Sequence, residues 1–124
     1  MTEERIKTVL NVHNSLRSKI ALGQVSGGLN GAVFPAASRM ATIKWNQELA
    51  DFALMNAKQC KMQHDMCHNT AELKFSGQNL GIFRAIFSFS DPDETLKDIL
   101  NGWFDEYKSA NATNIESLGS GFTR

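Results

Sequence analysis

Residues 91–107, "DPDETLKDILNGWFDEY", carry the clearest structural signal in this chain. Asp91 is a good N-cap, Pro92 suits the first turn of a helix, and Glu94 stands at the capping-box position. This stretch therefore predicts a helix with a broad apolar face directed into the core. The residues of that face recur at steps of three and four: Leu96, Ile99, Leu100, Trp103, Phe104 and Tyr107.

A first amphipathic helix is predicted over residues 3–22, where Thr2 can cap the start and Gly23 can end the helix. Residues 23–44 are rich in glycine and other small residues and show no periodicity, so a long loop is expected there. The apolar stripe of the first helix consists of Ile6, Val9, Leu10, His13, Leu16 and Ile20.

A further helix is predicted over residues 47–60. Asn46 can act as its N-cap, while Trp45 packs back on the first turn as a hydrophobic staple. Small alanines on its inner face would let another layer approach closely. That face is expected to contain Leu49, Ala50, Phe52, Ala53, Ala57 and Cys60.

The chain offers little material for a β-sheet. Residues 75–83, "FSGQNLGIF", suit one strand or an extended loop, and residues 109–124 are too sparse in hydrophobic residues for a good strand. One strand cannot form a sheet, and three helices with broad apolar faces need a partner surface. The fold is therefore either an all-helical bundle with long loops or a domain whose remaining strands lie outside this sequence.

Composition excludes several function classes. A chain of 124 residues suffices for one domain with one core. Its 13 basic and 13 acidic residues cancel and form no basic run, which argues against nucleic-acid binding. No apolar run reaches the ~20 residues of a transmembrane helix, and the charged start "MTEERIKTVL" lacks the apolar block of a signal peptide. A soluble single domain is expected.

Residues 60–70, "CKMQHDMCHNT", hold both cysteines and two of the three histidines. The spacing of the two cysteines is not that of a zinc finger, and four ligands from so short a helix would strain a tetrahedral site, so structural zinc is disfavoured. The alternatives are buried thiols and a helix-end histidine bonded to backbone carbonyls. If this stretch were helical, four potential zinc ligands would share one face: Cys60, His64, Cys67 and His68.

Four stretches together resemble a known superfamily. They are "VHNSLRSKIALG" (12–23), "MATIKWNQELADFALMNAKQC" (40–60) with the nearby "HDMC", "SGQNLG" (76–81) and "GWFDEY" (102–107). In this order they resemble the cysteine-rich secretory proteins, antigen-five allergens and plant pathogenesis-related proteins (CAP), and most closely the insect antigen-five branch. The similarity runs from about Ile6 to Leu118 and so covers nearly the whole chain.

The resemblance implies an α+β fold, an α-β-α sandwich that here lacks its C-terminal strands. Residues 1–124 would be a single CAP domain, incomplete at its C-terminus. It also implies a secreted, extracellular protein without enzymatic activity, which binds a small hydrophobic ligand of the lipid or sterol class or an extracellular protein. Four phenylalanines either contact such a ligand or fill the core: Phe75, Phe83, Phe87 and Phe89.

The family's cleft carries two histidines and two acidic residues, which hold a divalent metal in some members. His64 matches the first histidine and Glu106 matches one acidic residue, whereas Gln78 stands where many members have glutamate. The second histidine belongs to a "GHYTQ"-like motif that this sequence does not contain. No cofactor is therefore expected to be required, and His64 with Glu106 would hold zinc or magnesium weakly at most.

A metal-dependent hydrolase, with its second histidine in a missing C-terminal segment, is the alternative function. Catalysis would need about three protein ligands on the metal or a second titrating group, and Gln78 does not titrate. An enzyme is therefore not expected. His68 has no role in the match to the family.

In antigen-five proteins the cysteines at these positions pair with cysteines of an N-terminal extension, which this sequence lacks. Cys60 and Cys67 are therefore disulfide candidates that are expected to be free or paired with each other. Direct pairing needs Cα atoms within about 7 Å, which an unbroken helix between them would forbid. Asn111, in "NAT", would be a glycosylation acceptor in the secretory pathway.

Overall fold

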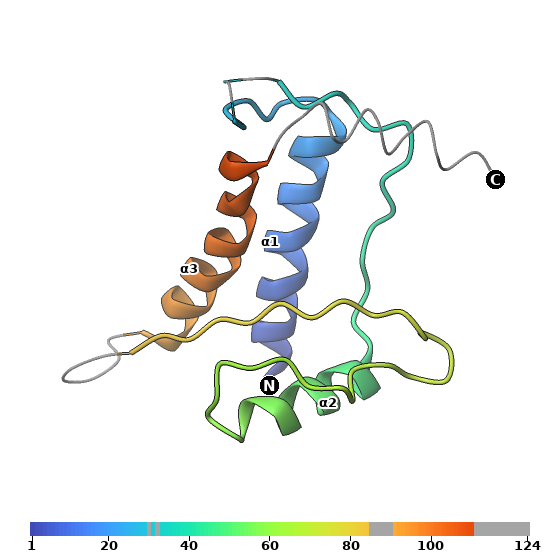
Figure 1. Ribbon diagram of the computed structural model, residues 1–124, viewed down its shortest axis with the longest axis vertical. Coiled ribbons are helices and arrows are strands. Elements are labelled where there is room, and N and C mark those ends of the chain that lie inside the picture. Colours follow the sequence, from blue (N-terminus) through green and yellow to red (C-terminus); the bar gives the residue numbers. More distant parts are fainter. Residues whose placement is uncertain (30, 32, 85–90, 111–124) are drawn as a thin grey trace.

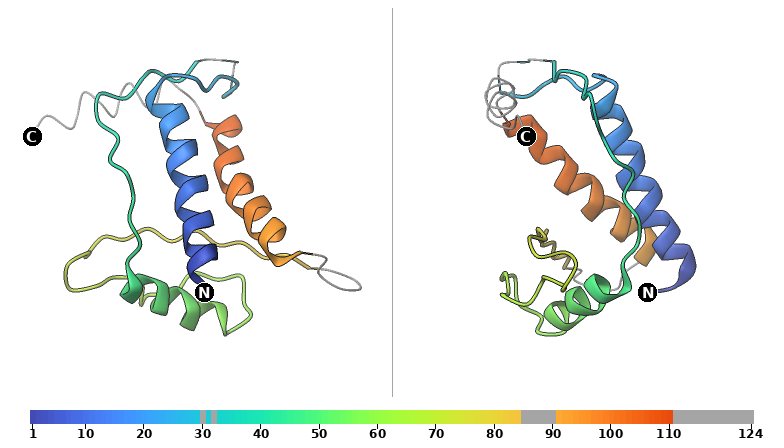
Figure 2. Two further views of the ribbon diagram at one scale, coloured as in Figure 1. Left: turned by 180° about the vertical axis from the view of Figure 1, so that it is seen from behind. Right: turned by 90° about the vertical axis from the view of Figure 1, so that its right-hand side faces the viewer.

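The computed structural model describes residues 1–29, 31, 33–84 and 91–110. These residues form three α-helices and one short 3-10 helix: α1 (Glu3–Ala21), α2 (Gln47–Ala57), α3 (Pro92–Asp105) and η1 (Glu106–Ser109). α1 and α3 lie side by side, and α2 lies across the N-terminal end of α1 (Figures 1 and 2). None of the three helices is long and apolar enough to cross a membrane in the part of the chain described.

The helices begin where their caps predict. Thr2 Oγ1 accepts a hydrogen bond from Arg5 N at 3.3 Å at the start of α1. Asn46 Oδ1 accepts one from Leu49 N at 3.0 Å at the start of α2, and Asp91 Oδ1 accepts one from Asp93 N at 2.8 Å at the start of α3. Each side chain satisfies a backbone N–H that has no partner inside the helix. All three predicted N-caps are confirmed.

α2 ends three residues earlier than predicted, at Ala57. The amides of Gln59 and Cys60 donate to the carbonyls of Asn56 and Ala57, each at 3.0 Å, and Cys60 then takes φ +53°. A residue in the left-handed region stops a helix, because its carbonyl no longer points along the axis. The stretch from residue 60 to residue 70 is consequently not helical, and its four potential zinc ligands do not share a helix face.

No strand forms within the described residues. Ser26 and Val33 make an isolated antiparallel bridge inside the long loop predicted over residues 23–44, and residues 78–84 form an extended loop. The family's sandwich therefore has no counterpart of its sheet in this part of the chain. Helices α1 and α3 instead pack directly on each other.

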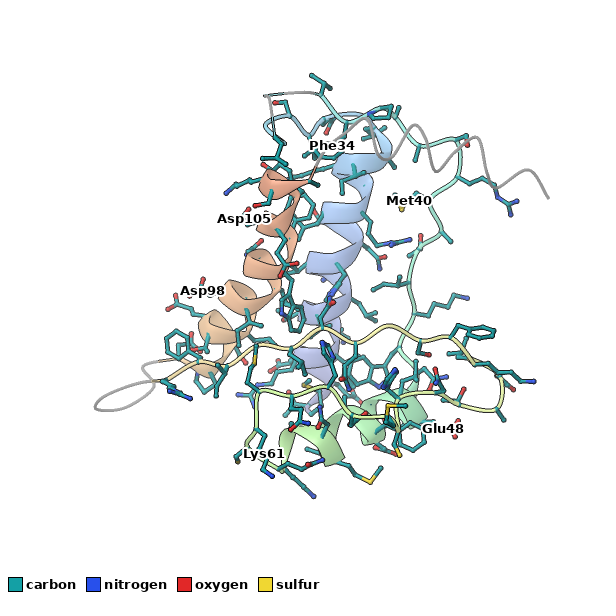
Figure 3. All side chains as sticks on the ribbon, viewed as in Figure 1. Phe34, Met40, Glu48, Lys61, Asp98 and Asp105 are labelled. Carbon is teal, nitrogen blue, oxygen red and sulfur yellow. The ribbon has the colours of Figure 1, made fainter. Side chains whose placement is uncertain are left out.

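The buried core is small and lies at the C-terminal ends of α1 and α3, where Figure 3 labels Phe34. The ring of Phe34 meets that of Tyr107 nearly at right angles, with centroids 5.9 Å apart, and Tyr107 also contacts Phe104 at 5.0 Å. Such edge contacts are favourable for aromatic pairs. The buried hydrophobic residues in the described part are Val25, Phe34 and Leu100.

The predicted inner face of α2 is wrong for its C-terminal half, whereas Leu49, Ala50 and Phe52 are half-buried. Ala53, Ala57 and Cys60 are exposed, and the residue that α2 buries is the polar Asn56, whose Nδ2 donates to the carbonyl of Gln63 at 3.2 Å. Within the described residues α2 packs on neither α1 nor α3. Amphipathic spacing identifies the face that a helix would bury, but it does not supply the layer that would cover that face.

The apolar face of α3 is covered only in part. Leu100 is buried, while Ile99, Trp103 and Phe104 remain half-buried. The prediction that this face is core is therefore right for its centre and too strong for its flanks. Trp103 sits against His13 of α1, with ring centroids 6.5 Å apart.

The loop that leads from α1 to α2 is held along α1 by side chains. Asn14 donates from Nδ2 to the carbonyl of Ile43 at 3.2 Å and accepts from its amide at 2.9 Å. Arg17 donates to the carbonyl of Ala41 at 2.8 Å. These bonds satisfy backbone groups that would otherwise need a strand or water as their partner.

Several large apolar side chains are exposed on α2 and on the loop that follows it. Phe75 is 99% exposed and Met66 is 90% exposed. Phe75 therefore does not fill the core, Phe83 is also exposed, and Phe87 and Phe89 lie outside the described residues. Other exposed apolar side chains on these segments are Leu54, Met55, Met62, Leu73 and Ile82. Isolated domains rarely leave so many apolar groups uncovered.

We expect the 124-residue chain to unfold over a broad temperature range and to bind a hydrophobic dye such as anilinonaphthalene sulfonate. The physical reason is the small number of buried hydrophobic side chains among the described residues. Scanning calorimetry and dye fluorescence would measure both properties. A sharp cooperative transition without dye binding would contradict this expectation.

Candidate functional site

Two adjoining hollows lie where the 60–84 loop meets α3. The first, here called the polar hollow, has a volume of about 410 Å³ and is lined by His64, Gln78 and Glu106 among others. The second, the apolar hollow, has a volume of about 340 Å³ and reaches from this point to α2. The two share part of their lining: Met62, Gln78, Asn79, Leu80 and Trp103.

The segment 78–82 is held against α3 at two adjacent residues. Trp103 Nε1 donates to the carbonyl of Leu80 at 2.8 Å. Next to it, Gly81 lies so close to α3 that a Cβ atom there would be 2.6 Å from Ile99 Cγ2 and 3.4 Å from Trp103 Cζ2. Glycine is therefore required by the close approach, and this approach sets where Gln78 lies relative to α3.

The structure brings together the three residues that match the family's cleft. His64 Nδ1 lies 2.9 Å from Gln78 Oε1, and both line the polar hollow. Glu106 lines it from the opposite element, at the junction of α3 and η1, and is exposed. Among the described residues no hydrogen bond or ion pair joins Glu106 to His64 or Gln78.

Asp65 organises this corner, although the sequence analysis did not single it out. Its Oδ1 accepts from the amide of Cys67 at 3.1 Å, from His68 Nδ1 at 3.3 Å and from Gln78 Nε2 at 3.4 Å. His68, which has no role in the match to the family, is thus a partner of Asp65. The local signal for Asp65 was available, because an aspartate two residues before a turn amide is typical of an Asx turn.

Cys60 and Cys67 are free, exposed thiols in this structure. The alternative of two buried thiols is wrong, because both residues lie exposed beyond the end of α2. The residues between them are not helical, so the helix-based objection to their pairing with each other does not apply. Their role as disulfide candidates stays a prediction, and Asn111 lies outside the described residues.

The donor set of the polar hollow does not fit a zinc site. His64 and Glu106 would supply one imidazole and one carboxylate, and the amide oxygen of Gln78 already faces His64. Protein zinc sites use three or four such ligands. No group of three or more His, Cys, Asp and Glu side chains that could hold a metal forms within the described residues.

Comparison with known proteins gives a consistent result. The family model described as "Cysteine-rich secretory protein family" (CAP) matches residues 10–121. The chain is similar to "Antigen 5 like allergen Cul n 1" of Culicoides nubeculosus, with 40% identity over 94% of this chain and 49% of that protein. It is also similar to "Venom allergen-1" of Aedes albopictus, with 38% identity over 95% of this chain and 44% of that protein.

A further relative, "Venom allergen 5" of Microctonus hyperodae, is 31% identical over 99% of this chain and 52% of its own length. The chain thus spans about half the length of the curated relatives that it matches. No solved structure matches it.

We expect Gly81→Ala to detach the 78–82 segment from α3, because the new Cβ would collide with the Ile99 side chain. The indole N–H of Trp103 would then lose the Leu80 carbonyl and exchange faster with solvent in nuclear magnetic resonance spectra. Gly77→Ala is the matched control, since a Cβ there meets nothing within 4 Å. Equal exchange rates in the two variants would show that the close approach is not required.

Proposed function

The chain belongs to the cysteine-rich secretory protein (CAP) family, and from that premise we propose that it is a secreted, antigen-five-like binding protein without enzymatic activity. The proposed ligand is a small hydrophobic molecule of the lipid or sterol class, bound in the apolar hollow. An extracellular protein partner on the exposed apolar side chains is the other outcome that the experiment below distinguishes.

The lining of the apolar hollow carries this proposal. Its volume of about 340 Å³ lies in the range of small-molecule sites, roughly 300–1,000 Å³. A hydrophobic ligand there would remove apolar surface of α2, of α3 and of the intervening loop from water, at about 25 cal/mol per Å² buried. The apolar residues of the lining are Ala53, Ala57, Met62, Leu80, Ile82, Leu96, Ile99 and Trp103.

The family fold proposed for residues 1–124 is a single domain with an α-β-α sandwich. The exposed inner face of α2 and the half-covered face of α3 support it, because in a sandwich both faces would meet a sheet. Within the described residues these two faces border the apolar hollow.

An extracellular location is proposed from the similarity to these relatives. The relatives' names mark them as an allergen and as venom allergens. In an oxidising compartment the exposed thiols of Cys60 and Cys67 would be available for pairing, and the sequon at Asn111 would be a glycosylation acceptor.

The absence of enzymatic activity is proposed from the chemistry of the polar hollow. An acid–base mechanism needs two titrating groups with separated pKa values, and Gln78 is a neutral amide hydrogen-bonded to His64. Glu106 is exposed, and within the described residues it makes no hydrogen bond to His64. The cleft residues thus offer a surface for binding rather than a paired acid and base.

We expect the chain to bind a fluorescent fatty acid such as cis-parinaric acid saturably, and Ile82→Glu to weaken this binding at least about tenfold. Ile82 lines the hollow, and a carboxylate there would lose its hydration against the ligand. Leu73→Glu is the control, because Leu73 is similarly exposed but does not line the hollow. Failure to bind, or an equal loss in both variants, would count against the ligand and favour a protein partner.

A metal-dependent hydrolase is the alternative function, and one observation favours it: His64 and Glu106 line the same hollow. Because the described residues supply no third ligand, we expect zinc to change the midpoint of thermal unfolding very little. Circular dichroism melts with and without zinc would measure this. A large, saturable rise that His64→Ala abolishes and the control His68→Ala preserves would establish the alternative.

A further inference from the structure

The imidazole of His64 has two nitrogens, and the one that carries the hydrogen decides what the polar hollow offers to a ligand. In the neutral ring one nitrogen donates and the other accepts. The hydrogen bond made by one nitrogen fixes the character of the other. His64 Nδ1 lies 2.9 Å from Gln78 Oε1, so the orientation of the Gln78 amide decides the tautomer.

Asp65 fixes the orientation of that amide. The backbone N–H of Asp65 lies 3.4 Å from Gln78 Oε1, and Asp65 Oδ1 lies 3.4 Å from Gln78 Nε2. The first group can only donate and the carboxylate can only accept. A flipped amide would place two donors together at Asp65 N and two acceptors together at Asp65 Oδ1. The two long contacts therefore act in the same sense, and the oxygen of Gln78 faces His64.

We infer that Gln78, held by Asp65, is a positioning residue that keeps neutral His64 in the tautomer protonated at Nδ1. The Nδ1–H group donates to Gln78 Oε1. His64 Nε2 has no hydrogen-bond partner among the described residues, and it is left as an acceptor for an O–H or N–H group of a ligand in the polar hollow. This inference is independent of lipid binding in the apolar hollow.

The chemistry of the pair explains why an amide suits this position. An amide both accepts from His64 and donates to Asp65, which a carboxylate cannot do. Glutamate at position 78 would still accept from His64 Nδ1, but it would place a second negative charge beside the Asp65 carboxylate. Methionine would keep the length of the side chain and remove both polar contacts.

The test is the nitrogen spectrum of the full chain, labelled with ¹⁵N, at a pH of about 8.5, where an unperturbed histidine is neutral. Long-range ¹H–¹⁵N correlations distinguish the two tautomers. In water the Nε2–H form of a histidine side chain without other hydrogen-bond partners is the more populated. We expect wild-type His64 to be mainly Nδ1–H, and Gln78→Met to lower the ratio of Nδ1–H to Nε2–H by a factor of roughly 2 to 10.

His13 is the internal control, because its Nδ1 faces the carbonyl of Val9 at 2.9 Å and does not depend on Gln78. Gln63→Met is the matched control variant, since Gln63 also lines the polar hollow without bonding to His64. Gln78→Glu should keep the Nδ1–H form. A wild-type His64 protonated at Nε2 would overturn the inference without any variant, as would an unchanged ratio in Gln78→Met with His13 intact.

Discussion

The contact of the 78–82 segment with α3 is the constraint on which the candidate site depends. The carbonyl of Leu80 accepts from the indole of Trp103, and the adjacent Gly81 leaves no room for a side chain against Ile99. Because both contacts fall on neighbouring residues, the segment is fixed in position and in direction. This contact sets the position of Gln78. The side chain of Gln78 in turn bonds to His64 and Asp65, which lie at the other end of the loop. The polar and apolar hollows adjoin at this contact, because Leu80 and Trp103 line both of them.

In this chain, side-chain hydrogen bonds satisfy loop backbone groups that a β-sheet would pair in other domains. Asn14 engages Ile43, Arg17 engages Ala41, and Asn56 engages Gln63. Such bonds satisfy polar groups but bury little apolar surface, and burial is the dominant favourable term in folding. The arrangement is therefore well specified locally, while several large apolar side chains of α2 and of the loop that follows it stay exposed.

Features determined by neighbouring residues could be predicted from the sequence. The starts of all three helices depend on a cap and the next three residues, and Thr2, Asn46 and Asp91 each act as expected. The family could also be predicted, because four short stretches occur in the right order. The inner face of α2 could not, since its burial depends on a layer that amphipathic spacing does not supply. The bond of Asp65 to Gln78 could not be predicted either, because Gln78 lies 13 residues further along the chain.

The double hydrogen bond between Asn14 and Ile43 has a consequence for how this chain tolerates change. The side-chain amide of Asn14 bonds to both the N–H and the carbonyl of Ile43. The extended segment therefore cannot shift along α1 without losing both bonds at once. Insertions or deletions upstream of Ile43 would thus have to be accommodated within the glycine-rich loop after Gly23, between the residues that bond to α1. The two bonds of Asn14 fix the length of chain between α1 and the first turn of α2. We therefore expect homologues to differ in length between Gly23 and Ile43 rather than between Ile43 and α2.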